Sequence, residues 1–414
     1  MLIVRELPGA RNGLAYALSP VEDLVKTVVA KSYEELLEAA RRAERPLVLY
    51  GLSTPAFVEY WREVADVAAR YPVVVGGPQA IGDPLVLLRL GVKYVVIGDG
   101  EAALPAIIER ELNGASAAPP NTLFLEGERV KAGPRVYVDL DRYRTYSKAL
   151  DAYPPIEIMR GCPYRCSFCL TWRLSPVRYR SVDSVAEMVR AYVKRGLADI
   201  RFVAPVGFLY GSKDGRTVDV AVLVQLLEAV RREGGRPFLG TFPSETRPET
   251  VTDEVLRSIK GLVANRKISF GLQTGSKRLL ELSKRGHDVE TAIQAAETAR
   301  RHGFMAIVDI ITGLPGEEEE DVDATVAAME RLVKLGAKIR LHYFIPLPGT
   351  PLWGLEPAPF SDKYRKFVAR YRPYVEGYWE EQIELSAKIR SAYREVLRYL
   401  SLTSPNSSAI FKYQ

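Results

Sequence analysis

Short runs of β-branched residues alternate with amphipathic stretches over the first 112 residues of the chain. The runs have the length of strands, and the stretches place apolar residues at every third or fourth position, as helices do. Strands separated by helices pair in parallel and form doubly wound sheets. The pattern therefore predicts an N-terminal α/β domain. Its predicted strands are residues 26–30, 46–50, 71–75 and 93–97, and its predicted helices are residues 33–42, 57–70 and 101–112.

Small and polar residues follow three of these predicted strands. In a Rossmann-like, doubly wound sheet, the carboxyl ends of the strands form the edge at which ligands bind. The sequence therefore predicts a ligand-binding edge, although the glycines would also be explained by tight strand-to-helix turns alone. The candidate residues are Ser53, Thr54, Gly76, Gly77, Gly98 and Gly100.

A second alternation of strands and helices begins at Ile156 and contains six units. Six units predict a partial (β/α)6 barrel, in which chemistry takes place at the carboxyl ends of the strands. The predicted strands are residues 156–159, 200–204, 237–241, 267–272, 305–311 and 339–345, and the predicted helices are residues 181–195, 218–232, 248–260, 276–283, 288–301 and 318–335.

A proline-bearing break at residues 113–121 separates the two alternations. Residues 122–138 then read as a hairpin that turns at Glu126 and Gly127. We therefore predict an N-terminal domain at residues 1–120, a hairpin linker at 121–155, a barrel at 156–352 and a helical extension at 353–414.

Aromatic residues recur every three to four positions in the extension, among several basic residues. This spacing favours one helical face packed on a core, which Pro373 must end or kink. Aromatic residues interleaved with basic ones would also suit RNA. The aromatic residues are Tyr364, Phe367, Tyr371, Tyr374 and Tyr378.

Composition sets broad limits on function. The 57 basic and 51 acidic residues leave a net charge of +6, which permits a nucleic-acid partner but does not indicate one. No run of 18 apolar residues occurs and the first residues lack an apolar signal segment, so we expect a cytoplasmic protein without membrane insertion. Asn and Gln total only 11, a scarcity that suggests a thermophilic source.

The chain has three cysteines, Cys162, Cys166 and Cys169, and all lie in one loop after the first barrel strand. Three thiolates can hold three corners of a four-iron cluster, and the fourth iron then has no protein sulfur and is open to a ligand. The alternative is zinc, but structural zinc takes four protein ligands, and the nearest histidine after the loop is His287. An iron-sulfur cluster is the favoured interpretation.

The C-x3-C-x2-C spacing, with Phe168 before the third cysteine, resembles the signature of the radical S-adenosylmethionine (SAM) superfamily. The resemblance implies a 4Fe-4S cluster whose open iron is chelated by the amine and carboxylate of SAM. It further implies a one-electron donor such as ferredoxin or flavodoxin, and cleavage of SAM to a 5′-deoxyadenosyl radical that abstracts hydrogen from a substrate. The cofactor carries this chemistry, and the protein supplies orientation and exclusion of water.

Residues 156–352 further resemble the branch of that superfamily that contains tRNA methylthiotransferases and cobalamin-dependent methylases. The resemblance implies that Glu245 suits the amino group of SAM and Arg285 its carboxylate, although both could instead be solvated charges at the rim. Asp309 lies within an apolar strand and reads equally as a catalytic or a structurally paired carboxylate. The residues predicted to contact SAM are Phe168, Pro205, Gly207, Ser244, Glu245, Gln273 and Arg285.

The cysteine count narrows the function within that branch. A methylthiotransferase would need three further cysteines for a second cluster, and none remain. The N-terminal domain resembles a cobalamin-binding domain, but it lacks the D-x-H-x-x-G element because no histidine precedes His287. The leading hypothesis is a radical SAM methylase of an unreactive carbon that uses cobalamin as methyl carrier. The alternatives are a cobalamin-free radical SAM coupling, rearrangement or cyclisation and, more remotely, a non-enzymatic iron-sulfur or RNA-binding module.

Overall fold

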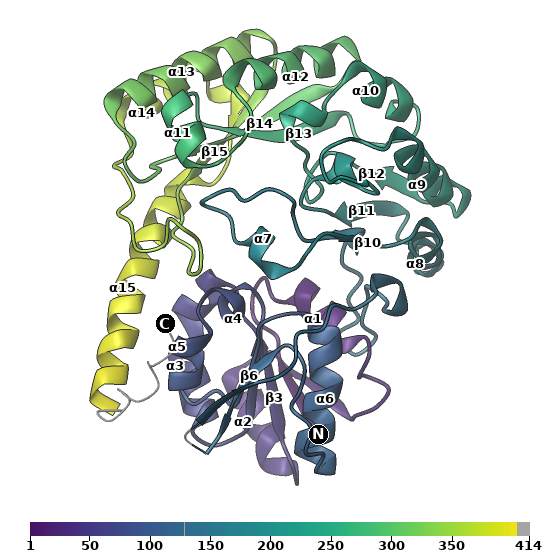
Figure 1. Cartoon of the computed structure of the whole chain (residues 1–414), viewed down its shortest axis with the longest axis vertical. Coiled ribbons are helices and arrows are strands. Elements are labelled where there is room, and N and C mark those ends of the chain that lie inside the picture. The colour runs from purple at the N-terminus through teal and green to yellow at the C-terminus, as the bar shows by residue number, and fades with distance from the viewer. Residues whose placement is uncertain (128, 404–414) are drawn as a thin grey trace.

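The computed structural model describes residues 1–127 and 129–403 and consists of two α/β units, one above the other in Figure 1. The lower unit has a seven-stranded sheet of order β2-β1-β3-β4-β5-β6-β7. The first five strands are parallel and the last two are antiparallel additions. The strands are β1 (Leu2–Arg5), β2 (Thr27–Ala30), β3 (Leu47–Gly51), β4 (Val73–Gly76), β5 (Tyr94–Val96), β6 (Thr122–Glu126) and β7 (Arg129–Ala132).

Helices cover both faces of this sheet, as expected for a doubly wound domain. Two helices, α1 (Arg11–Leu18) and α6 (Gly100–Asn113), pack on one face. The other face carries α2 (Tyr33–Arg42), α3 (Thr54–Ala68), α4 (Pro78–Gly82) and α5 (Pro84–Arg89). The sequence analysis missed β1 and α1. It did predict the β6–β7 hairpin, which joins the N-terminal sheet.

The upper unit is a partial barrel of parallel strands. Two sheets of order β12-β11-β8 and β13-β14-β15-β16 are connected by a bridge between Thr246 and Phe270. The strands are β8 (Ile156–Glu157), β11 (Asp199–Val203), β12 (Arg236–Phe238), β13 (Lys267–Gln273), β14 (Met305–Thr312) and β15 (Lys338–Tyr343). The predicted fold class, a doubly wound domain followed by a partial (β/α)6 barrel and a helical tail, is confirmed.

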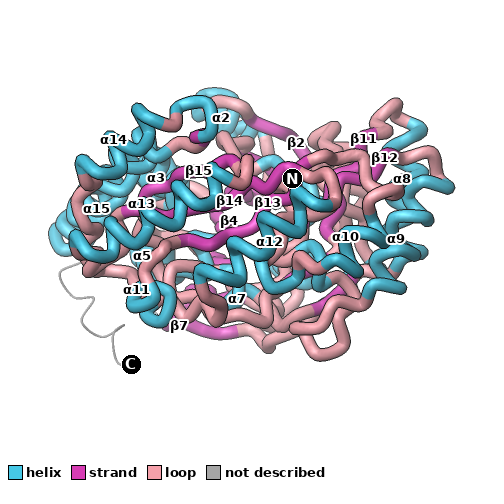
Figure 2. Tube along the Cα trace, turned by 90° about the horizontal axis from the view of Figure 1, so that it is seen from above, coloured by secondary structure: helices cyan, strands magenta, loops and turns pink. Residues whose placement is uncertain are grey.

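Amphipathic helices form the outer layer of the barrel, as Figure 2 shows from above. Their buried faces meet the buried faces of the strands in one apolar core. A short antiparallel pair, β9 (Met159–Arg160) and β10 (Arg178–Tyr179), and helix α7 (Thr171–Leu174) flank the cysteine loop. The outer helices are α8 (Val182–Lys194), α9 (Val220–Arg232), α10 (Asp253–Ile259), α11 (Lys277–Leu282), α12 (Val289–Arg301) and α13 (Glu319–Lys334).

The C-terminal extension joins both units instead of forming a separate layer. Helix α14 (Asp362–Arg370) ends before Pro373, as predicted, and strand β16 (Val375–Glu376) then pairs in parallel with β15. Helix α15 (Trp379–Thr403) runs from the barrel down along the N-terminal domain, where it packs on α3. Residues 404–414 lie outside the described residues.

Only part of the predicted aromatic face of the extension is buried. Tyr364 and Phe367 belong to the barrel core, which agrees with packing. Tyr374 and Tyr378 are exposed, and Tyr378 is 71% exposed, so the single packed face predicted for all five aromatic residues is wrong. The reason is the turn at residues 372–374, which rotates the chain out of the phase of α14.

Charged side chains connect the two units beside the cysteine loop. Arg160 forms ion pairs with Asp99 and Glu101 of the N-terminal domain and with Glu157 of the barrel, at 2.6–2.9 Å. Arg178 forms a second ion pair with Asp99. All five side chains are largely buried, so removal of one partner would leave an uncompensated charge at the junction.

Candidate active site

The cysteine loop follows β9 and is held by backbone contacts from two sides. Gly161 has φ of +81°, and a Cβ there would collide with the carbonyl of Pro176, so the turn into the loop requires glycine. Ser167 donates through its backbone nitrogen to the carbonyl of Ser283 (3.0 Å) and through its hydroxyl to that of Leu282 (2.9 Å). Trp172 donates from Nε1 to the carbonyl of Cys166 (3.3 Å).

Two buried arginines converge on the sulfur of Cys166. Arg285 donates from Nη1 to this sulfur at 3.2 Å and from Nη2 to the carbonyl of Gly271 at 2.7 Å. Arg247 places its Nη1 4.0 Å from the same sulfur and stacks on the ring of Tyr164, 3.6 Å from the ring centroid. A hydrogen bond from Arg247 to the carbonyl of Arg285 joins the two side chains.

Arg285 lacks a carboxylate partner among the described residues, although it is buried, and its Nε has no hydrogen-bond acceptor there. An isolated buried charge is unfavourable, and burial lowers the pKa of this guanidinium while Cys166 raises it. A negatively charged group at the thiols would compensate the positive charge of Arg285. The residues present therefore fit an anionic thiolate cluster.

The thiols themselves also fit a cluster with several irons. All three cysteines are free, and burial raises the pKa of the Cys162 thiol to about 11, so this group becomes a thiolate only when metal or a cation stabilises it. Among the described residues, no three His, Cys, Asp or Glu side chains are arranged around the position of one metal ion. Irons at separate corners of a cluster do not require the sulfurs to converge on a single point.

The residues predicted to contact SAM fall into two adjoining groups. Gly207 donates from its backbone nitrogen to the carbonyl of Glu245 at 2.7 Å, and a Cβ at Gly207 would collide with the carbonyl of Ser244. The Pro205 loop and the loop at Ser244 and Glu245 are thus in contact. In the second group, Gln273 leaves strand β13 at φ of +80° next to Gly271, whose carbonyl accepts from Arg285.

The structure shows two contacts of Arg285 that the sequence did not predict. Its guanidinium donates to Cys166 and Gly271, and its contact with the SAM carboxylate stays a prediction. Sequence could not show this, because Arg285 lies 119 positions from Cys166 and only the barrel closure brings them together. The contacts of Phe168, Pro205, Gly207, Ser244, Glu245 and Gln273 with SAM stay predictions.

Asp309 belongs to a charged group on the face of the strands that is turned away from the helices. Arg340 approaches Asp309 (3.3 Å), Glu245 (3.5 Å) and Glu376 of the appended strand β16 (3.2 Å). Burial raises the pKa of Glu245, and Asp309 adds to that rise. One guanidinium thus faces three carboxylates, which leaves the group with excess negative charge. Sequence reasoning missed Arg340 and Glu376.

His342 completes this group, and its tautomer follows from its neighbours. The backbone nitrogen of Tyr343 donates to Oε1 of Gln382 at 2.9 Å, so Nε2 of Gln382 faces Nδ1 of His342 at 3.3 Å. Nδ1 is then the acceptor and the proton lies on Nε2, which points toward Asp309 at 3.6 Å. Helix α15 therefore orients the imidazole of His342 with Nε2 toward the Asp309 carboxylate.

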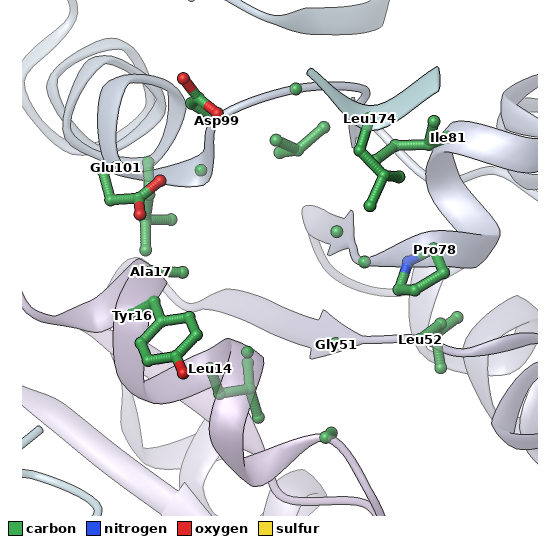
Figure 3. A pocket seen from close by; sticks show the side chains of 18 of the residues that line it. Leu14, Tyr16, Ala17, Gly51, Leu52, Pro78, Ile81, Asp99, Glu101 and Leu174 are labelled. Atoms are coloured by element: carbon green, nitrogen blue, oxygen red, sulfur yellow. The ribbon is translucent and has the colours of Figure 1, made fainter. Parts of the chain in front are cut away.

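A cavity of about 420 Å³ lies at the strand edge of the N-terminal domain (Figure 3). Helix α1 contributes Leu14, Tyr16 and Ala17, and the barrel closes it with Arg160 and Leu174. The lining is predominantly apolar and contains seven glycines. The predicted residues Ser53, Gly76, Gly77, Gly98 and Gly100 line this cavity.

The other predicted residue, Thr54, is buried as the first residue of α3 and is not part of the cavity wall. The hydroxyl of Ser53 accepts the backbone N–H of Ala56 and caps α3, and its own proton can still be donated to a ligand in the cavity. Helix α3 begins at Thr54 and buries its side chain, so Thr54 is not placed to contact such a ligand.

The glycines of the wall have different roles. A Cβ at Gly77, where φ is +97°, would meet the carbonyl oxygen of Leu52 at 2.7 Å, so this glycine is required by the chain itself. A Cβ at Gly98 would meet Arg135 and Asn121. At Gly76, in contrast, the nearest atom would be the Cβ of Val96 at 3.8 Å, and glycine there leaves free space in the cavity.

Comparisons with known proteins agree with this geometry. The model of the radical SAM superfamily matches residues 156–329. Residues 156–329 are a radical SAM domain. The resemblance noted for the cysteine loop is thereby confirmed, and with it the expectation of an enzyme.

Relatives of the chain extend beyond this radical SAM domain. An uncharacterised methyltransferase of Pyrococcus horikoshii is 26% identical over 83% of this chain and 78% of its own length. An uncharacterised protein of Methanopyrus kandleri is 25% identical over 71% of this chain and 65% of its own length. A tRNA-2-methylthio-N(6)-dimethylallyladenosine synthase of Chromohalobacter salexigens is 30% identical over 49% of this chain and 45% of its own length. The chain thus spans less than two thirds of the latter two relatives.

Two solved structures share the fold of most of this chain. The radical SAM methyltransferase TsrM from Kitasatospora setae, with cobalamin and a 4Fe-4S cluster bound, superposes with a TM-score of 0.68 at 19% identity and covers 85% of this chain and 76% of TsrM. The cobalamin-dependent radical SAM enzyme OxsB, with aqua-cobalamin and SAM bound, gives 0.64 at 14% identity over 80% of this chain and 51% of OxsB. In the described residues of this chain, no helix is long and apolar enough to cross a membrane.

Proposed function

We propose that this protein is a radical SAM enzyme that holds a 4Fe-4S cluster on Cys162, Cys166 and Cys169, binds SAM at the barrel strand ends, and methylates an unactivated carbon with cobalamin as methyl carrier. The observation that carries the cobalamin part is the cavity between the N-terminal domain and the barrel. It lies at the strand edge where doubly wound domains bind cofactors.

The cavity has the character of a site for a large, uncharged ring system. Its surface is mainly apolar, and Gly76 and Gly13 leave space where side chains would otherwise project. Its charged members are Arg160 and the carboxylates of Asp99, Glu101 and Glu157, and all three carboxylates form ion pairs with Arg160. The dimethylbenzimidazole base of a cobalamin fits this apolar lining, whereas the two phosphates of a dinucleotide would need positive partners, and the lining has three carboxylates for one arginine.

No histidine of the N-terminal domain is available to the cobalt, since the first histidine of the chain is His287. Bound cobalamin would therefore lack a protein nitrogen ligand from this domain. The cofactors would supply the methyl group and the radical chemistry, and the chain binds, orients and excludes water.

The substrate would lie against the charged group on the inner strand face. Asp309 lies there between Nε2 of His342 at 3.6 Å and the guanidinium of Arg340 at 3.3 Å, so a carboxylate and an imidazole would face the substrate together. A one-electron donor such as ferredoxin or flavodoxin remains a predicted partner. We expect the protein to be located in the cytoplasm.

The test is anaerobic purification and reconstitution, with iron, sulfide and cobalt measured on the same sample. We expect about four irons per chain, with one equivalent of corrinoid retained through gel filtration. SAM carrying a deuterated methyl group, incubated with reductant, should yield 5′-deoxyadenosine and S-adenosylhomocysteine together. Cleavage of SAM without any corrinoid uptake would overturn the methylase and favour the cobalamin-free enzyme, and absence of both iron and SAM binding would overturn the radical SAM activity itself.

A further inference from the structure

The three cysteine sulfurs differ in the charge of their hydrogen-bond partners. Cys169 has neutral partners in Thr171, because its thiol donates to the hydroxyl at 3.3 Å and accepts from the backbone nitrogen at 3.4 Å. Cys162 accepts from the backbone of Tyr164, which is also neutral. Cys166 is contacted by Arg285 at 3.2 Å, with Arg247 at 4.0 Å. Charged donors are therefore concentrated at one corner of the proposed cluster.

The two arginines are not equivalent. Arg247 forms an ion pair with Glu249, so much of its charge is compensated locally. Arg285 is buried and forms no ion pair with a described carboxylate. The side chain is nevertheless fixed in place, because Nη2 donates to Gly271 and its backbone carbonyl accepts from Arg247.

We propose that Arg285 is a positioning residue that sets the reduction potential of the cluster by placing an uncompensated positive charge on the sulfur of Cys166. This inference rests on the proposed function, in which the cysteine loop holds the cluster. Reduction adds one negative charge, and a cation in direct contact stabilises the reduced form more than the oxidised form. Hydrogen bonds to cluster sulfurs and the net charge around them tune such potentials.

Arg247 helps to hold Arg285 in position. It holds the backbone of Arg285 and stacks on Tyr164, which lies in the cysteine loop, so it connects the loop with the Arg285 segment. His287, two residues further on, adds no charge at neutral pH, because burial and then the two arginines lower its pKa to about 4. Arg285 is thus the dominant uncompensated charge beside Cys166.

The experiment is a redox titration of reconstituted protein, without SAM, followed by the electron paramagnetic resonance signal of the reduced cluster. Arg285→Gln removes the charge, and Arg285→Lys keeps the charge but loses the planar donor geometry. Arg165→Gln is the matched control, since Arg165 lies in the same loop and is exposed, with its charge screened by water. Iron and sulfide are measured for every sample.

At the wild-type midpoint potential, Arg285→Gln should decrease the ratio of reduced to oxidised cluster about tenfold, which is 59 mV for a one-electron couple. Arg285→Lys should give a smaller decrease in the same direction, and Arg165→Gln should change the ratio less than twofold. If Arg285→Gln does not retain iron, the midpoint potentials of Arg285→Lys and Arg165→Gln are compared. A lower midpoint for Arg285→Lys alone then supports the role of Arg285, and equal midpoints overturn it.

The outcomes separate the two proposals. A wild-type chain that assembles no cluster would contradict the proposed function. A chain that assembles the cluster, with equal midpoints for the wild type and both Arg285 variants, would overturn the role of Arg285 and leave the proposed function intact. Weaker SAM binding by the Arg285 variants at an unchanged midpoint potential would indicate that Arg285 binds the SAM carboxylate. That result would likewise overturn the inference.

Discussion

The cavity of the N-terminal domain and the cysteine loop of the barrel are built on opposite physical principles. The cavity exists because side chains are absent, at Gly13 and Gly76 above all, and its charged groups are paired. The loop is tightly held, but the neighbouring Arg285 has no carboxylate partner among the described residues. The cavity thus offers empty apolar space, whereas the cysteine loop has beside it a buried cation without a carboxylate partner.

This difference indicates what each region can bind. Empty apolar space favours an uncharged ring system, since burial of apolar area contributes about 25 cal/mol per Å². An unpaired buried cation favours an anion, because its desolvation has already been incurred during folding. Arg160 connects the regions through Asp99 and Glu101, so the two sites share one rigid junction.

The comparison predicts that the two sites can be lost separately. Cys166→Ala should abolish cluster assembly and SAM cleavage, because the chain has no spare thiolate. None of the three cysteines lines the cavity, so corrinoid uptake should persist. Iron, sulfide and cobalt analysis of the same reconstituted sample checks both statements. Near-stoichiometric iron in a variant that lacks Cys162, Cys166 and Cys169 would contradict the cluster assignment.

The reverse separation is expected from Gly76→Val. Its two added methyl groups enter the free space near Val96, so the variant should fold and keep its iron while corrinoid affinity falls at least tenfold. Gly261→Val is the matched control, since a Cβ at Gly261 meets nothing within 4 Å and the residue is outside the cavity. Gly77 is unsuitable, because a side chain there collides with Leu52. Equal corrinoid retention by both variants would remove the cavity as the cobalamin site.

Local patterns were sufficient to predict most of the fold. The periodicity of residues 289–301 and 319–334 gave helices α12 and α13 within a residue or two, and the β-branched runs gave β13 and β14. These elements have a strong apolar repeat, and their neighbours in sequence are also their neighbours in space. Strand β16 escaped prediction because two residues carry no periodicity and its pairing with β15 is a long-range contact.

The sequence predicted only the part of the candidate site whose residues lie close together along the chain. The cysteines share one loop, so their common purpose follows from sequence alone. The contacts of Arg285 with Cys166, of Arg340 with Glu376, and of Arg160 with Asp99 join residues that are 36 to 119 positions apart. A charged residue at a strand end looks the same in sequence whether it faces a cofactor, a cysteine or another domain.

The N-terminal domain should also depend on the C-terminal half of helix α15, whereas the barrel is contacted by the first turns of that helix. Tyr393 of α15 is buried in the core of that domain and accepts a hydrogen bond from Gln79, beside the cavity wall, at 2.6 Å. Tyr393→Ala should decrease the free energy of unfolding by about 3 kcal/mol. Leu397→Ala is the control at a half-exposed position of the same helix and should cost under about 0.5 kcal/mol.

Denaturant unfolding followed by domain-resolved hydrogen exchange checks this dependence. Faster exchange of the N-terminal strands, with the barrel strands unchanged, is the expected pattern for Tyr393→Ala. Equal acceleration in both units would show that α15 stabilises the chain as a whole and not the N-terminal core in particular.

An effect that depends on pH is expected at a buried carboxyl of the barrel, Glu317. Burial raises the pKa of Glu317 to about 7, although the backbone nitrogen of Gly313 and the hydroxyl of Tyr364 each donate to it at 2.8 Å. The folded state therefore holds a proton that the unfolded state releases near pH 4.5, so Glu317 opposes folding increasingly as pH rises from about 4.5 to 7. Glu317→Gln keeps an acceptor oxygen without the charge. The melting temperature of the variant minus that of the wild type should be near zero at pH 5, rise through pH 7 and level off above it. A difference that does not change with pH would show that Glu317 is ionised in the folded protein throughout this range.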